Sequence, residues 1–182
     1  MKYFYIHGWG ATGETTVKRL KEVISEEITI LKWDCQKPFQ ENYDKLFKFM
    51  KDEKAKGDCV LMGSSMGGFY ANAIASELSI HCALFNPVSN PKEVLKKFQK
   101  DAPELITDEL INSYSEVRNR TTLRLVIIGK NDEVLDSSKS INYWKHLAHL
   151  FEITEYGHEI KDFKPFKKDF EFISKYVNFD DM

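Results

Sequence analysis

Short apolar runs alternate along the chain with longer segments of mixed polarity. The runs are apolar at nearly every position, which is typical of strands that are covered on both faces. They lie at 2–6, 28–33, 58–63, 81–86, 123–129 and 151–156. The segments between them are helix-like and lie at 14–26, 41–55, 66–78, 91–99, 137–149 and 165–177. In the second of these, Tyr43, Leu46 and Met50 recur at helical spacing.

Regular alternation of strands and helices predicts an α/β fold: a six-stranded parallel sheet with right-handed crossovers and helices on both faces. The chain has 182 residues, which is the length of one domain with a core of its own. We therefore interpret 1–182 as a single domain. One connection, 100–121, is longer than the others and has an apolar helical face. It is either a packing helix or a small lid over a site.

Charge and cysteine content exclude several classes of protein. The net charge is −2 and the lysines are dispersed among acidic residues, so we expect no nucleic-acid partner. Cys59 and Cys82 lie inside apolar runs, and Cys35 has no cysteine near it, so we expect neither a disulfide framework nor a metal site. No run is long enough to insert into a membrane, and the first is too short for a signal peptide. We expect a cytoplasmic protein.

Candidate chemistry first arises in the stretch GSSMGG, which joins the third predicted strand to the next helix. Ligands of parallel sheets bind at the carboxyl ends of the strands, and this turn lies at such an end. The pattern G-x-S-x-G fits only with Ser65 at its centre, because Gly63 and Gly67 then flank it. The turn brings these flanking positions so close together that side chains would clash. The pattern predicts Ser65 as a nucleophile and Ser64 as a neighbour that packs or caps.

A serine nucleophile needs a base, and in this setting an acid and then a histidine follow it along the chain. His158 follows the last predicted strand on a loop from which it can reach Ser65. Asp132 and Asp136 both follow the fifth strand. We favour Asp132 as the acid, because Asp136 stands directly before a helix and is typical of an N-cap. We assign structural or surface roles to the other histidines: His7, His81, His146 and His149.

An oxyanion hole requires two N–H donors close to the nucleophile. One is the backbone N–H of the residue after the nucleophile, Met66. The other is expected from the loop after a neighbouring strand, where the sequence HGWG makes Trp9 the candidate. His7 precedes the nucleophile in the chain, which is the wrong order for the base, so we expect it to position this loop.

Together these motifs resemble the α/β hydrolases, and most closely the YqiA-like small bacterial esterases. The resemblance extends over nearly the whole chain and is carried by HGWG, GSSMGGFYA, NPVSNPKEVL, NDEVLD and YGHEI. It implies a sheet of strand order 2-1-3-4-5-6, with Ser65 as nucleophile, Asp132 as acid and His158 as base. It also implies carboxylesterase activity on short acyl esters and thioesterase activity on acyl-CoA.

The sequence therefore predicts a serine hydrolase that cleaves small carboxylic esters or thioesters through an acyl-enzyme, with no metal or organic cofactor. Two alternatives remain open at this point. The same triad can transfer the acyl group to an acceptor other than water. A hydrolase fold can also serve as a catalytically idle binding module, because the fold alone does not determine function.

Overall fold

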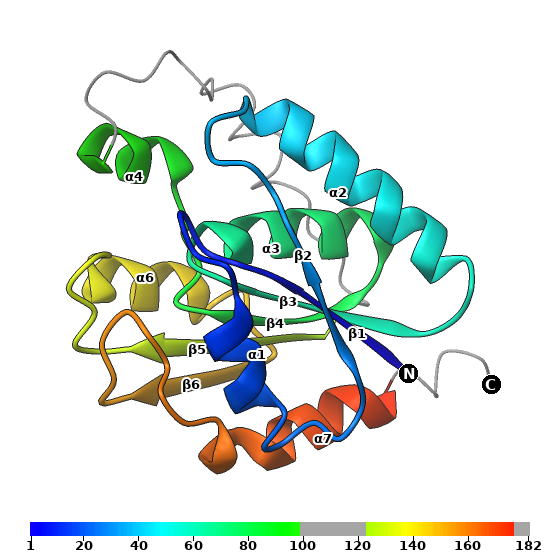
Figure 1. The fold of residues 1–182 in the computed structure, drawn as a ribbon. Coiled ribbons are helices and arrows are strands. Elements are labelled where there is room, and N and C mark those ends of the chain that lie inside the picture. Colours follow the sequence, from blue (N-terminus) through cyan, green and yellow to red (C-terminus); the bar gives the residue numbers. More distant parts are fainter. Residues whose placement is uncertain (99–122, 177–182) are drawn as a thin grey trace.

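The computed structural model describes residues 1–98 and 123–176. Its centre is one sheet of six strands, all parallel, in the order β2-β1-β3-β4-β5-β6 (Figure 1). The strands are β1 (Lys2–Ile6), β2 (Ile28–Leu31), β3 (Cys59–Ser64), β4 (His81–Phe85), β5 (Arg124–Gly129) and β6 (Leu150–Thr154). The predicted fold class and strand order are both confirmed.

Helices cover both faces of the sheet. They are α1 (Glu14–Leu20), α2 (Phe39–Lys54), α3 (Met66–Leu78), α4 (Pro91–Phe98), α6 (Ser137–Trp144) and α7 (Lys167–Tyr176), with a 3₁₀ turn η1 (Lys164–Phe166) before the last. The helices α2, α3 and α6 lie over one face, and α1 and α7 lie over the other (Figure 1). The predicted lid segment, 100–121, lies outside the described residues.

The strand β1 shows how one sequence serves both layers. Successive side chains of a strand point to opposite faces. Phe4 and Ile6 belong to the core under α2 and α3, whereas Tyr3 and Tyr5 belong to the core under α1 and α7. All four are buried, so the run is apolar or aromatic throughout rather than alternating.

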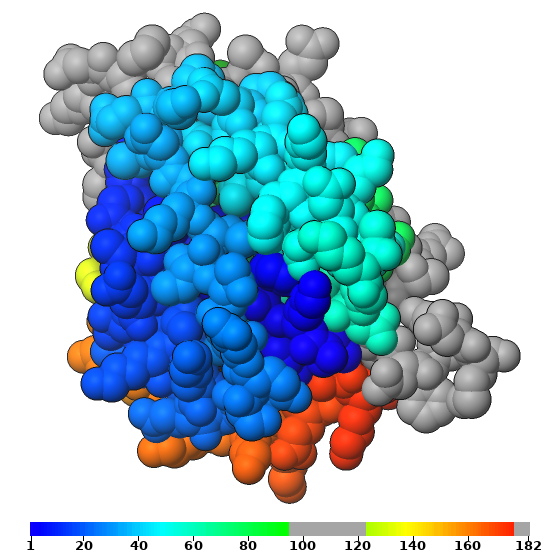
Figure 2. Space-filling model, turned by 45° about the vertical axis from the view of Figure 1, so that its right-hand side comes forward, coloured from blue at the N-terminus to red at the C-terminus, as the bar shows by residue number. Residues whose placement is uncertain are grey.

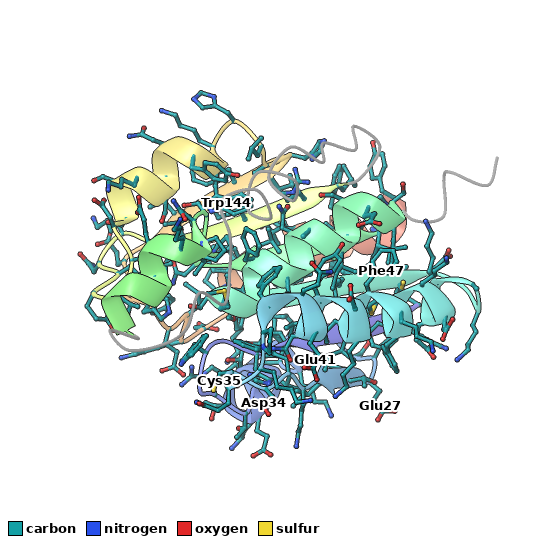
Figure 3. The ribbon with its side chains drawn as sticks, turned by 90° about the horizontal axis from the view of Figure 1, so that it is seen from above. Glu27, Asp34, Cys35, Glu41, Phe47 and Trp144 are labelled. Carbon is teal, nitrogen blue, oxygen red and sulfur yellow. The ribbon has the colours of Figure 1, made fainter. Side chains whose placement is uncertain are left out.

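The layer of α2, α3 and α6 is built around α3, which is buried from Met66 to Ser76. Figure 3 looks onto this layer and shows Trp144 between α6 and α3. Its indole N–H donates to the carbonyl of Pro87 at 3.0 Å. On the face shown in Figure 2, the start of the chain is visible between α2 above and α7 below.

Several predicted element boundaries are wrong. The strand predicted at 28–33 ends at Leu31, because the chain turns there to bring Trp33 against His7. The helix predicted at 14–26 ends at Leu20 and is followed by tight turns.

The helix predicted at 137–149 ends at Trp144, so His146 and His149 lie beyond it. The chain leaves the helix early because the N–H of His149 already pairs with the carbonyl of Arg124 at the start of β5. His149 also accepts the N–H of Arg124 through Nδ1 at 3.2 Å, and its partial burial lowers its pKa.

Within 1–98 and 123–176, no helix has both the length and the apolar character needed to cross a bilayer.

Candidate active site

Ser65 occupies a strained turn between β3 and α3. Its backbone angles are φ 52° and ψ −123°, a region that residues other than glycine rarely adopt. The turn is fixed by three backbone hydrogen bonds: the Ser65 N–H donates to Phe85, and its carbonyl accepts from Phe69 and Val88. These bonds hold the strain in place, and they tie the turn to the residues that end and follow β4.

The glycines on either side of Ser65 are required by close backbone contacts. A Cβ at Gly63 would lie 2.4 Å from the carbonyl oxygen of Gly67. A Cβ at Gly67 would lie 2.2 Å from the carbonyl oxygen of Ile6 and 2.3 Å from that of His7. The first turn of α3 can therefore approach the end of β1 only if this position carries no side chain.

Asp132 and His158 form a direct pair at the ends of β5 and β6. Nδ1 of His158 lies 2.8 Å from Oδ2 and 3.0 Å from Oδ1 of Asp132. Oδ1 of Asp132 also accepts the N–H groups of Val134 and Leu135, each at 2.8 Å. This buried carboxylate already accepts two backbone N–H groups, so we infer that it also accepts a hydrogen bond from the imidazole. Nδ1 then carries the proton, and Nε2 is left as the basic nitrogen.

The second acid after β5 has a different partner. Asp136 caps α6, and its Oδ1 accepts the N–H of Lys139 at 3.0 Å. Asp136 is exposed, whereas the side chain of Asp132 is 2% exposed. The structure thus places only one of the two acids against His158.

Ser65 and His158 line the same cavity, which has a volume of about 450 Å³. Within the described part of the chain, the Ser65 hydroxyl and His158 Nε2 are not hydrogen-bonded to each other. In hydrolases without substrate this bond is often long and shortens when substrate binds. The structure therefore brings the predicted acid and base into contact and places the predicted nucleophile in the same cavity.

The two predicted oxyanion donors lie near Ser65 on different elements. Met66 is the first residue of α3, where the backbone N–H has no partner within the helix. Trp9 lines the cavity in the loop after β1. His7 holds this loop: its Nδ1 pairs with the carbonyl of Gly8 at 2.8 Å, and Nε2 accepts the N–H of Trp33 at 3.4 Å. The His7 ring also stacks on Trp33. Both ring nitrogens therefore hold the loop after β1, one through Gly8 and the other through Trp33, as expected of a positioning residue.

Asn86 is a central residue of the site that the sequence did not reveal. It follows β4, is 1% exposed and has φ 42°. Its Nδ2 donates to the carbonyls of Gly157 and His158 at 3.0 and 2.8 Å, and its Oδ1 accepts the N–H of Gly129 at 2.7 Å. One amide therefore joins the end of β5 to the loop that carries the histidine. The available signal was the Asn-Pro pair after a strand, since asparagine tolerates positive φ.

Glu133 supports the same loop from outside. Its Oε2 accepts the backbone N–H of His158 at 3.0 Å, and this bond lowers the pKa of the Glu133 carboxyl. Gly157 leaves room for it, because a Cβ there would lie 2.5 Å from Glu133 Oε2. The histidine is thus held through its ring by Asp132 and through its backbone by Glu133 and Asn86.

Ser64 has a partner of its own. The hydroxyl of Tyr5 donates to Ser64 Oγ at 2.8 Å. Tyr5 is 1% exposed, and this burial raises its pKa, so it is present as the neutral phenol. The second serine of the stretch is therefore hydrogen-bonded to β1 rather than directed at His158.

A model of an uncharacterised protein family, UPF0227, matches residues 2–174. The chain belongs to this family. UPF0227 members similar to it include a protein of Klebsiella pneumoniae, 23% identical over 170 residues, and YcfP of Escherichia coli, 24% identical over 173 residues. Each alignment covers 88% of this chain and 92% of the relative.

Solved structures similar to this UPF0227 protein have the α/β-hydrolase fold. One is described as a putative hydrolase of the α/β superfamily from Xanthomonas campestris, with a TM-score of 0.63 at 14% identity and coverage of 98% and 96% of the two chains. Another is Est1E from Butyrivibrio proteoclasticus, with a TM-score of 0.64 at 15% identity and coverage of 97% and 89%. A third is an esterase of Pyrococcus furiosus, with a TM-score of 0.60 at 15% identity and coverage of 97% and 81%. These similarities establish the fold.

The contact of Gly67 with β1 gives a first prediction. In Gly67→Ala the new methyl meets backbone of a central strand, which cannot move aside, so we expect a loss of about 3 kcal/mol of unfolding free energy. Gly10→Ala is the control: its φ is +64° but nothing lies within 4 Å of the new Cβ. It should lose only about 1 kcal/mol, from backbone strain. Urea unfolding measures both, and equal losses would contradict the role given to Gly67.

The bonds of Asn86 give a second prediction. Asn86→Asp keeps the shape but sets carboxylate oxygens against two carbonyls, so we expect a loss of about 2 kcal/mol. Amide hydrogen exchange in 157–160 should also become faster. Asn42→Asp is a matched control, because Asn42 is equally buried and its Nδ2 also donates to backbone carbonyls, in the connection before α2.

Urea unfolding and hydrogen exchange read by mass spectrometry separate the two variants. Asn42→Asp should cost similar stability without selective change at 157–160. Unchanged exchange at 157–160 in Asn86→Asp would show that Asn86 does not hold the histidine loop.

Proposed function

We propose that this protein is a serine hydrolase that cleaves small carboxylic esters or thioesters through an acyl-enzyme. The observation that carries the proposal is the pairing of the buried Asp132 with His158, which lines the same cavity as the strained Ser65. A hydroxyl on a sharp strand-to-helix turn, a histidine with one basic nitrogen and a buried carboxylate are the components of nucleophilic acyl transfer.

In the proposed reaction, Ser65 Oγ attacks the carbonyl carbon of the substrate while its proton passes to Nε2 of His158. Asp132 holds the ring and stabilises the imidazolium. The N–H groups of Met66 and Trp9 donate to the oxygen that becomes negative. As the carbon–oxygen or carbon–sulfur bond to the leaving group breaks, His158 returns the proton to the alcohol or thiol. Water then attacks the acyl-enzyme with His158 again as base, which releases the acid and restores Ser65.

Two further observations support this proposal. The similar structures include one that is described as an esterase, from Pyrococcus furiosus. The cavity at Ser65 has about 450 Å³, which lies in the range of small-molecule sites.

The cysteines Cys35, Cys59 and Cys82 are all free, which supports a reducing compartment such as the cytoplasm. Burial raises the pKa of Cys59 to about 11, so we assign this thiol no chemistry.

The nucleophile is tested by comparing the two adjacent serines. Ser65→Ala should lower kcat on a short-chain ester by about 10⁴-fold or more and abolish labelling by a fluorophosphonate probe. Ser64→Ala should retain labelling, because its hydroxyl is bound to Tyr5. His158→Ala should abolish labelling as well, whereas His146→Ala, at an exposed position, should not. If Ser65→Ala is labelled and Ser64→Ala is not, the nucleophile is Ser64 and the assignment to Ser65 is wrong.

The acid is tested by amide replacement. In Asp132→Asn the side-chain amide faces Nδ1 of His158 and favours the wrong tautomer, so we expect kcat to fall by about 10⁴-fold with the fold intact. Asp136→Asn should change little, because asparagine also caps helices, and Asp136→Ala should lose about 1 kcal/mol of stability with activity largely kept. Steady-state kinetics and thermal unfolding of the three variants decide the assignment. An inactive Asp136→Asn beside an active Asp132→Asn would reverse it.

A further inference from the structure

The walls of the cavity at Ser65 combine apolar side chains with hydroxyl groups. The apolar members include Trp9, Phe85, Val94, Val134, Ile160 and Phe163. The hydroxyl groups come from Tyr5, Thr12, Thr15, Thr16, Ser64 and Ser65. Among the described lining residues there is no lysine or arginine, and the one carboxylate, Glu159, is paired with Arg19. Such walls suit an uncharged ligand that is partly apolar and carries polar oxygen atoms.

The hydroxyls of Tyr5 and Ser64 form a hydrogen-bonded pair at the cavity wall. Tyr5 has one hydroxyl hydrogen and gives it to Ser64 Oγ at 2.8 Å. Ser64 therefore accepts from Tyr5 and keeps its own hydrogen. Within 1–98 and 123–176, that hydrogen has no acceptor. Ser64 is half-buried and lines the cavity next to Ser65, so the unused donor lies beside the nucleophile.

A serine that receives a hydrogen bond becomes a better donor, because hydrogen bonds in a chain polarise one another. A donor in a small apolar cavity favours a ligand that offers it an acceptor and disfavours one that leaves it unpaired. Consecutive Cα atoms are about 3.8 Å apart, so the partner of Ser64 lies within a few bonds of the carbon that Ser65 attacks.

We propose that Ser64 is a substrate-binding residue, and that the substrates are uncharged esters or thioesters. These substrates carry a second oxygen, one that lies outside the ester or thioester group, within a few bonds of the scissile carbonyl. This inference rests on the proposed function and specifies its substrate class. The second oxygen belongs either to the acyl group or to the leaving alcohol, and both sources present the same acceptor to Ser64.

The test compares kcat/KM within two pairs of esters that differ only in that oxygen. On the acyl side the pair is para-nitrophenyl β-hydroxybutanoate and para-nitrophenyl butanoate. On the alcohol side the pair is glycol monobutanoate and ethyl butanoate. Each pair is measured with the wild type, Ser64→Ala and Tyr5→Phe. The matched control is Tyr3→Phe, because Tyr3 lies on the same strand and also pairs with a serine hydroxyl, that of Ser174, away from the cavity.

The wild type should prefer the oxygenated ester by about tenfold in one of the two pairs, which is the effect of one neutral hydrogen bond. Ser64→Ala should abolish that preference, and Tyr5→Phe should reduce it by about threefold, because the serine hydroxyl then loses its orienting partner. Tyr3→Phe should keep it. The pair that shows the preference identifies the source of the oxygen.

Two results would overturn the inference and leave the hydrolase proposal standing: equal hydrolysis within both pairs by the wild type, or a preference that survives in Ser64→Ala. Tyr5→Phe gives an independent reading if Ser64→Ala proves unstable. If the wild type cleaves none of the four esters and Ser65 is not labelled by the fluorophosphonate, the proposed function itself has failed, and this inference fails with it.

Discussion

The close contact between the first turn of α3 and the end of β1 determines most of the geometry around Ser65. Gly67 packs directly against the carbonyl groups of Ile6 and His7, and this contact leaves no room for a side chain. Because α3 begins so close to the sheet, the chain must reverse within one residue, and Ser65 takes up the unfavourable backbone angles. The cost of such a conformation, about 1–3 kcal/mol, is offset by packing and by the backbone bonds of Ser65. The position of Ser65 at the wall of the cavity is a consequence of helix–sheet packing.

Asp132 and His158 are likewise held in place by residues outside their own loops. Asp132 and His158 lie on loops, which are the most mobile parts of most proteins. Here Asn86, a buried residue of a third loop, binds backbone groups of Gly129 before Asp132 and of Gly157 before His158. Glu133 adds a bond to the backbone N–H of His158 from the surface. Reactive groups on loops keep a defined geometry only when neighbouring groups hold them. In this protein that support comes mainly from the residue that follows β4.

The sequence predicted those features whose physical causes are local. Continuous apolar runs reveal strands covered on both faces, and the glycines around Ser65 lie within five residues of one another in the pattern G-x-S-x-G. The sequence could distinguish the helix cap Asp136 from Asp132, because helix capping depends only on adjacent residues. Asn86 could not be identified in this way, because its partners lie 71 and 72 positions further along the chain. The end of α6 was misplaced for a related reason, since the chain after this helix pairs with the distant Arg124.

The hydrogen bonds of Asn86 also bear on how the protein is synthesised. They connect the middle of the chain to the end of β5 and to the loop after β6, so His158 can be positioned only after residues up to 158 have been made. Chains are synthesised from the amino terminus at about 5–20 residues per second, and contacts between distant segments form late in folding. A ribosome-bound chain that ends before this loop carries Ser65 but lacks His158 and the backbone groups that Asn86 binds. An unfinished chain therefore cannot assemble the site of the proposed reaction.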